Sequence, residues 1–442
     1  MITSTIGKIF LEAYNKKYST DYDAKTFFVE VYYPLFFDDN KYLMTAGNTP
    51  LENPKLSWDD MIAGKKPYET KEQRKERFQK LMEKIENNLP NTENSMGFAS
   101  SDVVATTSGQ TSNIQYPFSE DDIYFSWIGA SFGVGIEGGL SLLFPVEEIL
   151  LDLFDGWGLY RKVVNTNNQL KGNQISAWNG QWIVHRYDKK SFFQDSPMAN
   201  FNPLVSKKDK EGITVGTQSW LKVIVKIAQH FQSPQMMCYV YSFGKSNTTI
   251  GFIPLNLEHI RKPFELYKML FGINEGEKAE ILWSSEYAFK VCCQKGTIGV
   301  EAMKPNGLGK YIKDGAKKVK YDLNDEEQKI SFHTYQIWLL AMLNNQELWD
   351  KSQEFAELLH NCSASDSDTT NRGKKQEVNQ IVSDILSSKS RMRFIDNLTN
   401  LIPYLKEKKC VENIGIIINE MPIENVQYFL SLIKFNYELK KS

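Results

Sequence analysis

A stretch of side-chain amides and tryptophans at residues 165–188 has the residue types best suited to molecular recognition. It reads NTNNQLKGNQISAWNGQWIVHRYD and holds eight Asn or Gln side chains, two glycines and two tryptophans, with no carboxylate before Asp188. Each amide carries hydrogen-bond donors and an acceptor, so it can read base edges, sugars or the backbone of a partner. This amide-rich block therefore favours binding over bond cleavage, and we expect it to form a loop with short strand-like pieces.

Three kinds of side chain in the amide-rich block are candidates for contact with nucleic acid. Aromatic rings can stack on bases, amides can reach base edges, and cations can neutralise phosphates. The candidates are Trp178, Trp182 and Tyr187 for stacking, Asn173, Gln174, Asn179 and Gln181 for base edges, and Lys171 and Arg186 for phosphates. The alternative is a structural segment, in which the tryptophans belong to the core and the amides satisfy buried backbone groups.

The strongest local charge lies in the segment 304–320, KPNGLGKYIKDGAKKVK, where Asp314 is the lone acid. Its GLGK piece lacks the spacing and the Ser or Thr of a phosphate-binding loop, so a nucleoside triphosphate site is not expected. Flexible lysines can instead neutralise a nucleic-acid backbone, while glycines let the main chain approach. The alternative is an ordinary exposed loop. The candidate phosphate contacts are Lys304, Lys310, Lys313, Lys317, Lys318 and Lys320.

No convincing catalytic or metal-binding set stands out in the sequence. The five histidines are scattered, and the five cysteines lack zinc-like spacing, so we predict free thiols in a reducing cytoplasm, no metal and no cofactor. Glu277, Glu280 and Glu286 stand near Lys278 and Lys290, which leaves a metal-dependent nuclease as an alternative. Their surroundings are more typical of an amphipathic helix.

A glycine pattern at residues 133–138 matches the dinucleotide-binding motif G-x-G-x-x-G. Gly133, Gly135 and Gly138 have Asp155 downstream, roughly where such folds carry an acid that binds the ribose. However, these glycines fall within a wider glycine run, and no alternating series of strands and helices surrounds them. We therefore predict close helix packing or a turn here rather than a cofactor site.

Length and charge limit the class of protein. The chain has 442 residues, of which 41% are hydrophobic, so it can bury more than one core. Its 52 basic and 54 acidic residues nearly cancel, so any contact with nucleic acid must be local. The first residues lack the features of a secretion signal, and glycines and Glu137 interrupt the apolar segment 127–144. We expect a cytoplasmic protein that makes no membrane contact.

The elements that would position these residues suggest an α+β fold, with an irregular mixed N-terminal body at 1–323 and a C-terminal helical bundle at 324–442. The body contains a capped helix at 71–88, a helix at 219–230 and a hairpin formed by MMCYVYSF and TTIGFIPL. Helical spacing of apolar residues recurs throughout the rest. The helices predicted for the bundle are 325–344, 345–360, 376–388, 391–408, 411–420 and 423–438.

This layout resembles the large subunit of type I CRISPR surveillance complexes (Cascade), a divergent family of antiviral defence proteins. The similar segments are KTFFVEVYYPLFFDDNKYLMTAGN, SWIGASFGVGIEGGL, KGNQISAWNGQW and YVYSFGKSNTTIGFIPL. The resemblance implies a non-catalytic DNA- and RNA-binding subunit of a multi-subunit complex. Its N-terminal body would contact the end of the guide RNA and the flanking motif of the target DNA, and its bundle would stabilise the displaced strand.

In that family a separate helicase-nuclease cuts the DNA in trans, and the other effector subunits hold the guide. Sequence reading is left to base pairing, so the large subunit needs only shape, backbone and a few base-edge contacts. This division of labour agrees with the lack of an obvious catalytic set. The competing classes are a restriction-type or other defence nuclease and a scaffold that binds only protein.

Overall fold

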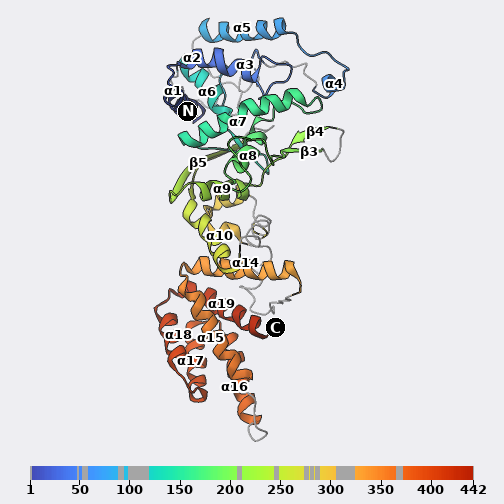
Figure 1. The fold of residues 1–442 in the computed structure, drawn as a ribbon. Helices are drawn as coiled ribbons and strands as arrows, with labels where there is room; N and C mark the ends of the chain where they lie inside the picture. The colour runs from blue at the N-terminus through green and yellow to red at the C-terminus, as the bar shows by residue number, and fades with distance from the viewer. Residues whose placement is uncertain are drawn as a thin grey trace. The chain divides into compact units, whose positions relative to one another are not determined.

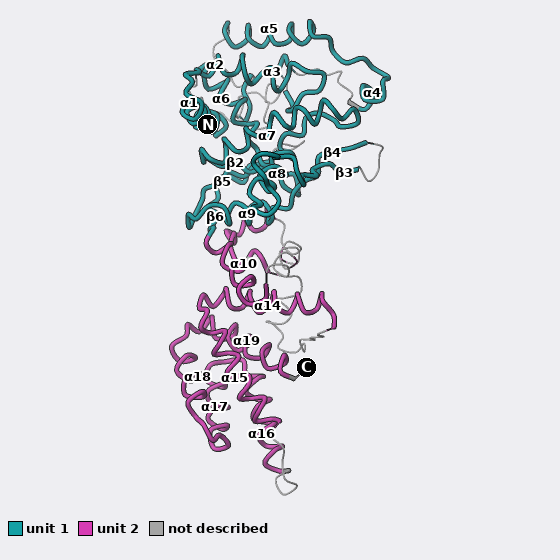
Figure 2. Tube along the Cα trace, viewed as in Figure 1, with its two compact units in different colours: residues 1–257 teal, residues 258–442 magenta. Residues whose placement is uncertain are grey.

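The computed structural model of the chain describes residues 2–46, 49–51, 58–87, 94–97, 119–206, 212–242, 248–272, 278, 283, 289–304, 324–364 and 372–441. These form two compact units, residues 1–257 and residues 258–442 (Figure 2). The first unit mixes helices with a small antiparallel sheet, and the second is helical (Figure 1). The predicted α+β class is therefore confirmed.

The helices of the first unit are each defined by a buried face or a cap. The sequence correctly places α5, whose start is capped by reciprocal hydrogen bonds between Thr70 and Gln73. Ser119 and Asp122 form a second capping box at the start of α6. The helices are α1 (Ile2–Tyr18), α2 (Ala24–Phe27), η1 (Phe28–Tyr32), α3 (Tyr33–Phe36), α4 (Trp58–Ile62), α5 (Lys71–Asn87), α6 (Glu120–Ala130), α7 (Glu147–Thr166), α8 (Ile175–Arg186) and α9 (Trp220–His230).

Aromatic rings fill the core between α1, α2 and α7. Phe10 contacts Phe27, Phe132 and Trp157, with ring centroids 5.6, 4.6 and 6.2 Å away. All four side chains are fully or almost fully buried. The aromatic run that follows residue 25 folds as consecutive helical turns, in which α2, the π-helical η1 and α3 follow one another without a break. These turns bury Phe27, Phe28, Tyr32 and Phe36.

The sheet is antiparallel throughout, with the strand order β1-β2-β5-β6. Its strands are β1 (Val134–Ile136), β2 (Leu140–Leu143), β5 (Gln235–Ser242) and β6 (Thr248–Asn256), while β3 (Leu204–Ser206) pairs separately with β4 (Ile213–Val215). The predicted hairpin of MMCYVYSF with TTIGFIPL is thus confirmed as β5 and β6. The apolar segment 127–144 proves to be the end of α6 followed by the β1–β2 hairpin.

The glycine motif at 133–138 lies in this hairpin. A helix does not follow β1, because Gly138 and Gly139 adopt positive φ and turn the chain directly into β2. Gly135 and Gly180 let β1 and α8 touch through their backbones, since a Cβ on Gly180 would lie 2.3 Å from the Gly135 carbonyl oxygen. The predicted packing and turn roles are confirmed, and the strand–helix context that a dinucleotide fingerprint requires is missing here.

The second unit is an assembly of helices. Gln336 of α14 hydrogen-bonds to Asn436 of α19, which donates to Ser352 of α15, so one buried polar chain links three helices. Asp325 caps the start of α14. The elements are α10 (Leu257–Phe271), α12 (Phe289–Lys295), η3 (Val300–Met303), α14 (Glu326–Leu343), α15 (Glu347–Ala364), α16 (Arg372–Leu386), α17 (Arg391–Leu401), η5 (Ile402–Tyr404), α18 (Lys409–Glu420) and α19 (Ile423–Lys441).

Two boundaries in the second unit differ most from those expected. The sequence places the division of the chain at residue 323, but Phe271 of α10 stacks on His333 of α14 at 3.8 Å, and α10 from residue 258 onward belongs to the second unit. The helix predicted at 391–408 ends at Leu401, because Pro403 follows in a short 3-10 turn. Among the helices that the structure describes, none has the length and apolar character needed to cross a bilayer.

Candidate functional site

The predicted loop is present at residues 167–174, which join α7 to α8 and include a bridge from Leu170 to Ile213. For residues 175–186 the prediction is wrong, because they form a helix. α7 extends to Thr166, and α8 begins at Ile175. Trp178 and Trp182 are four residues apart, so they fall on one face of α8, where both are buried and their indoles donate to the carbonyls of Gly156 and Asp152. Because burial of Trp178 and Trp182 determines the secondary structure of this segment, its mixed polar composition is a poor guide to that structure.

Asn179 holds three groups together in the core of the first unit. Its amide nitrogen donates to the carbonyls of Ser131 and Gly133 at 2.7 and 3.0 Å, and its amide oxygen accepts from the indole of Trp157 at 3.2 Å. The side chain is 0% exposed. In this fold, therefore, Asn179 satisfies buried backbone and indole groups, as the structural alternative for the block predicts.

Gln174 and Gln181 attach α8 to the segment 213–218. The Gln174 oxygen accepts from the hydroxyl of Thr214 and the backbone of Val215. Gln181 donates to the carbonyl of Gly216 at 2.8 Å and accepts from Gln218 at 2.9 Å. Both are half-buried. Their amides are thus engaged within the unit, although their partial exposure leaves one side open to solvent.

The other candidates in the block have separate roles. Lys171 pairs with Asp59 at 2.7 Å, and the Asn173 backbone takes a left-handed conformation with φ 59°. Arg186 pairs with Asp152 at 3.0 Å and lies over the Phe192 ring. Among the candidates in the block, Gln174, Asn179 and Gln181 therefore face neighbouring segments. Arg186 and Tyr187 join a cluster of ionisable groups.

The lysine-rich segment lies mostly outside the described residues, which include Lys304 alone of its candidates. Lys304 is half-buried, and its ammonium lies 5.3 Å from the centre of the Trp338 ring. The other predicted phosphate contacts lie outside the described residues; they are Lys310, Lys313, Lys317, Lys318 and Lys320. The acidic candidates for the nuclease alternative, Glu277, Glu280 and Glu286, also lie outside the described residues. Lys278, which is described, pairs with Glu326.

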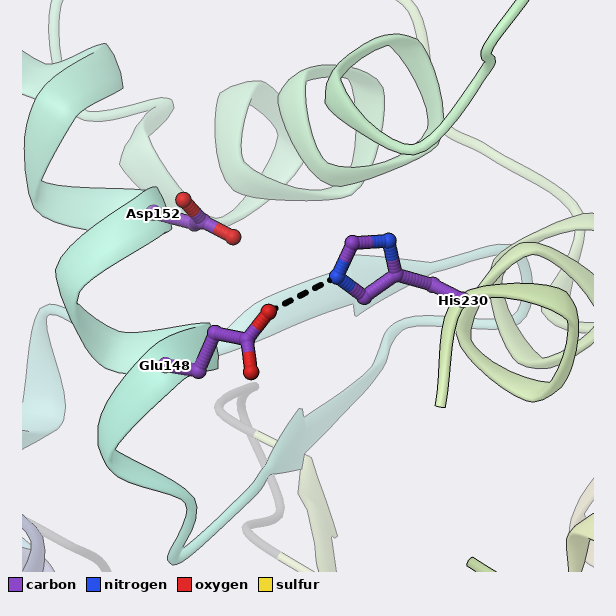
Figure 3. Close-up of side chains that lie close together, drawn as sticks. All are labelled: Glu148, Asp152 and His230. Atoms are coloured by element: carbon purple, nitrogen blue, oxygen red, sulfur yellow. Dashed lines mark hydrogen bonds and ion pairs between the residues drawn. The ribbon is translucent and has the colours of Figure 1, made fainter. Parts of the chain in front are cut away.

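A cluster of ionisable side chains that the sequence did not indicate joins α7 to the end of α9 (Figure 3). Glu148 and Asp152 are four residues apart on α7 and share one face, and His230 is the last residue of α9. One ligand atom from each lies within 4.8 Å of the other two. The His230 Nε2 and the Glu148 carboxylate are 2.8 Å apart.

The surroundings of this cluster hold its members in place. Arg186 donates two guanidinium hydrogen bonds to Oδ1 of Asp152, a residue that is 9% exposed. The Tyr187 ring stacks on the His230 ring at 3.9 Å and 11°. Burial, together with the neighbouring Asp152 carboxylate, raises the pKa of Tyr187 far above its ordinary value, so this phenol stays protonated.

A second group that the sequence did not indicate is a set of lysines at one end of the bundle in the second unit. α16 lies beside α17, and α17 beside α18 (Figure 1). Tyr404 lies close enough to the Glu377 carboxylate for it to raise the pKa of Tyr404. This proximity places the start of α16 at the same end as the turn between α17 and α18. The members of this lysine end are Lys374, Lys375, Lys406, Lys408 and Lys409.

The lysine end is solvated and lacks charge compensation by ion pairing. Four of its five lysines are exposed, and Lys375 is half-exposed. No ion pair to any of the five occurs among the described residues. A clue in the sequence was the run Lys406–Lys409, but the approach of Lys374 and Lys375 depends on the pairing of the helices.

Comparisons with known proteins add no relative. No family model matches the chain, and neither the curated proteins nor the solved structures contain a significant match.

Proposed function

We propose that this chain binds a nucleic-acid backbone without cleaving it. The observation that carries the proposal is the lysine end, which presents five cations on one end of a helical bundle with no acidic partner in an ion pair among the described residues. Lysines of this kind attract phosphates through charge alone, because they impose no demand on geometry. The lysine-rich segment 304–320 supplies further positive charge in the same unit.

The specific form of the proposal follows from the sequence resemblance to the large subunit of type I CRISPR surveillance complexes. Such a subunit would contact guide RNA and target DNA inside an assembly, and a helicase-nuclease acting in trans would cut the target. Because Asn179 is hydrogen-bonded to backbone carbonyls inside the first unit, we expect the nucleic-acid contacts to lie outside the buried part of the amide-rich block. Binding of the nucleic-acid backbone by the second unit is therefore the central element of the proposed function.

Replacing Lys374, Lys406, Lys408 and Lys409 together with glutamate is expected to weaken DNA association about tenfold or more near physiological salt. Each lost phosphate contact should also reduce the slope of log K against log salt concentration by about 0.7 to 0.9, so the slope should fall by about 3. Fluorescence anisotropy with labelled single-stranded and duplex DNA, repeated from about 50 to 200 mM salt, measures both quantities.

A matched control separates local binding from overall charge. Replacing Lys8, Lys75, Lys84 and Lys162 with glutamate makes the same change in net charge at exposed positions of the first unit. We expect this control to keep most of the affinity and the salt slope. Equal losses in both variants, or unchanged binding in the first, would contradict a role for the lysine end. Cleavage of the DNA on addition of Mg²⁺ would contradict the non-catalytic proposal.

The lysine-rich segment gives a separate expected result. Replacing Lys310, Lys313, Lys317 and Lys318 with glutamate should weaken DNA association in the assembled complex, since these lysines are the sequence's strongest candidates for phosphate contact. Co-purification with guide RNA and a repeated backbone subunit, followed by the same titrations, tests this step. Unchanged association at moderate salt would remove the segment from the interface, and purification with protein partners alone would favour a scaffold.

A further inference from the structure

The cluster at Glu148, Asp152 and His230 combines donors that suit a metal ion. One imidazole nitrogen and two carboxylates come from the face of α7 and from the end of α9, and in Figure 3 all three side chains point toward a common space. Within the part of the chain that the structure describes, it is the single group of three such residues whose ligand atoms converge. The donor set excludes ions that require thiolates.

The spacing of these atoms is close to that of a coordination site. A tetrahedral ion with bonds of about 2.1 Å holds its ligand atoms about 3.4 Å apart. The three atoms already lie within 4.8 Å of one another, and His230 and Glu148 are at 2.8 Å. The Glu148 side chain is 59% exposed, so it can swing by the small distance that closure of the site requires.

The partners around the cluster resemble those that orient metal ligands. Arg186 contacts only Oδ1 of Asp152, so the other carboxylate oxygen remains available to an ion. The guanidinium is itself held by Gln194 at 2.6 Å, so it can fix the Asp152 carboxylate without entering the site. The stacked Tyr187 ring sets the plane of the His230 imidazole.

A buried tyrosine hydroxyl borders the cluster. Tyr187 is 4% exposed, and its hydroxyl oxygen makes no hydrogen bond of good geometry to any described residue. The hydroxyl nevertheless lies close enough to Asp152 to interact with its carboxylate.

We propose that Glu148, Asp152 and His230 bind one divalent transition-metal ion, for which Zn²⁺ is the best match. Zn²⁺ accepts imidazole and carboxylate ligands together, whereas Mg²⁺ and Ca²⁺ favour all-oxygen sites. Three protein ligands leave a fourth position for water. The ion would link α7 to the end of α9 within the first unit. This site is separate from the lysine end and does not depend on the proposed function.

The test measures ion binding by the full chain. Purified protein is loaded with Zn²⁺, dialysed, and analysed for retained zinc, and its Co²⁺ form is examined by visible absorption. We expect one retained equivalent in the unmodified protein and in Glu147→Gln, a neighbouring exposed residue that undergoes the same charge change. Glu148→Gln and His230→Gln should each weaken binding about tenfold or more, because each removes one of three ligands.

Several results would overturn the proposal. These are no retained zinc in the unmodified protein, equal retention in Glu147→Gln and Glu148→Gln, or a Co²⁺ spectrum dominated by thiolate bands, which would place the ion on cysteines. If His230→Gln disturbs folding through the stacked Tyr187, the exposed Glu148→Gln decides the matter by itself. A rise in melting temperature with Zn²⁺ that Glu148→Gln abolishes would support the site.

Discussion

Replacing Gly129 with alanine is expected to destabilise the first unit by about 3 kcal/mol or more. Gly129 lies where α6 crosses α1, and a Cβ there would be 1.9 Å from the carbonyl oxygen of Thr3 and 2.7 Å from the amide nitrogen of Gly7. Both neighbours are backbone atoms, so no side chain can rotate away to make room. The two helices would have to separate, and Phe10 and Trp127 would lose part of their packing.

Gly158 provides the matched control for this change. It lies in α7, where a Cβ would meet no atom within 4 Å. Gly158→Ala should therefore raise stability by about 0.5 to 1 kcal/mol, because alanine loses less backbone entropy on forming a helix. Urea unfolding, followed by circular dichroism and tryptophan fluorescence, compares the two variants. Equal midpoints would show that α1 and α6 do not approach through their glycines.

Replacing Asn179 with alanine should also reduce stability, by about 3 kcal/mol. The change removes the hydrogen-bond partner of three groups: the carbonyls of Ser131 and Gly133 and the indole of Trp157. The Asn179 side chain that holds them is fully buried. Each unsatisfied buried group costs about 1 to 3 kcal/mol, although local relaxation and water entry recover part of the total. Thermal unfolding and urea midpoints measure the loss.

Asn179 also distinguishes a structural role from a recognition role for the amide-rich block. Gln181→Ala, at a half-buried amide nearby, serves as the comparison, with an expected loss of about 1 kcal/mol. If Asn179→Ala were as stable as the unmodified protein and instead bound DNA more weakly, the amide would belong to the binding surface. We expect the opposite result, with folding impaired and the intact lysine end retaining its affinity.

Much of the local structure follows from the sequence because it depends on neighbouring residues. The paired β segments around residue 245, the capped start of α5 and the bundle helices are all visible in periodicity and turn chemistry. The amide-rich block is the main exception. Its polar composition indicates a loop, which is present at residues 167–174, but residues 175–186 form a helix because the core buries the shared face of Trp178 and Trp182.

By itself, the sequence determined the α+β class, the helical character of residues 324–442 and the lysine-rich composition of residues 304–320. Tertiary packing alone decided which distant residues meet. Glu148 and Asp152 share a helix face by spacing, yet His230 joins them only because α9 ends beside α7. Likewise, Lys374 joins the lysines near 406 only because α16 and α17 pack together. Periodicity fixes the face a residue occupies, whereas the contacts of that face depend on the whole core.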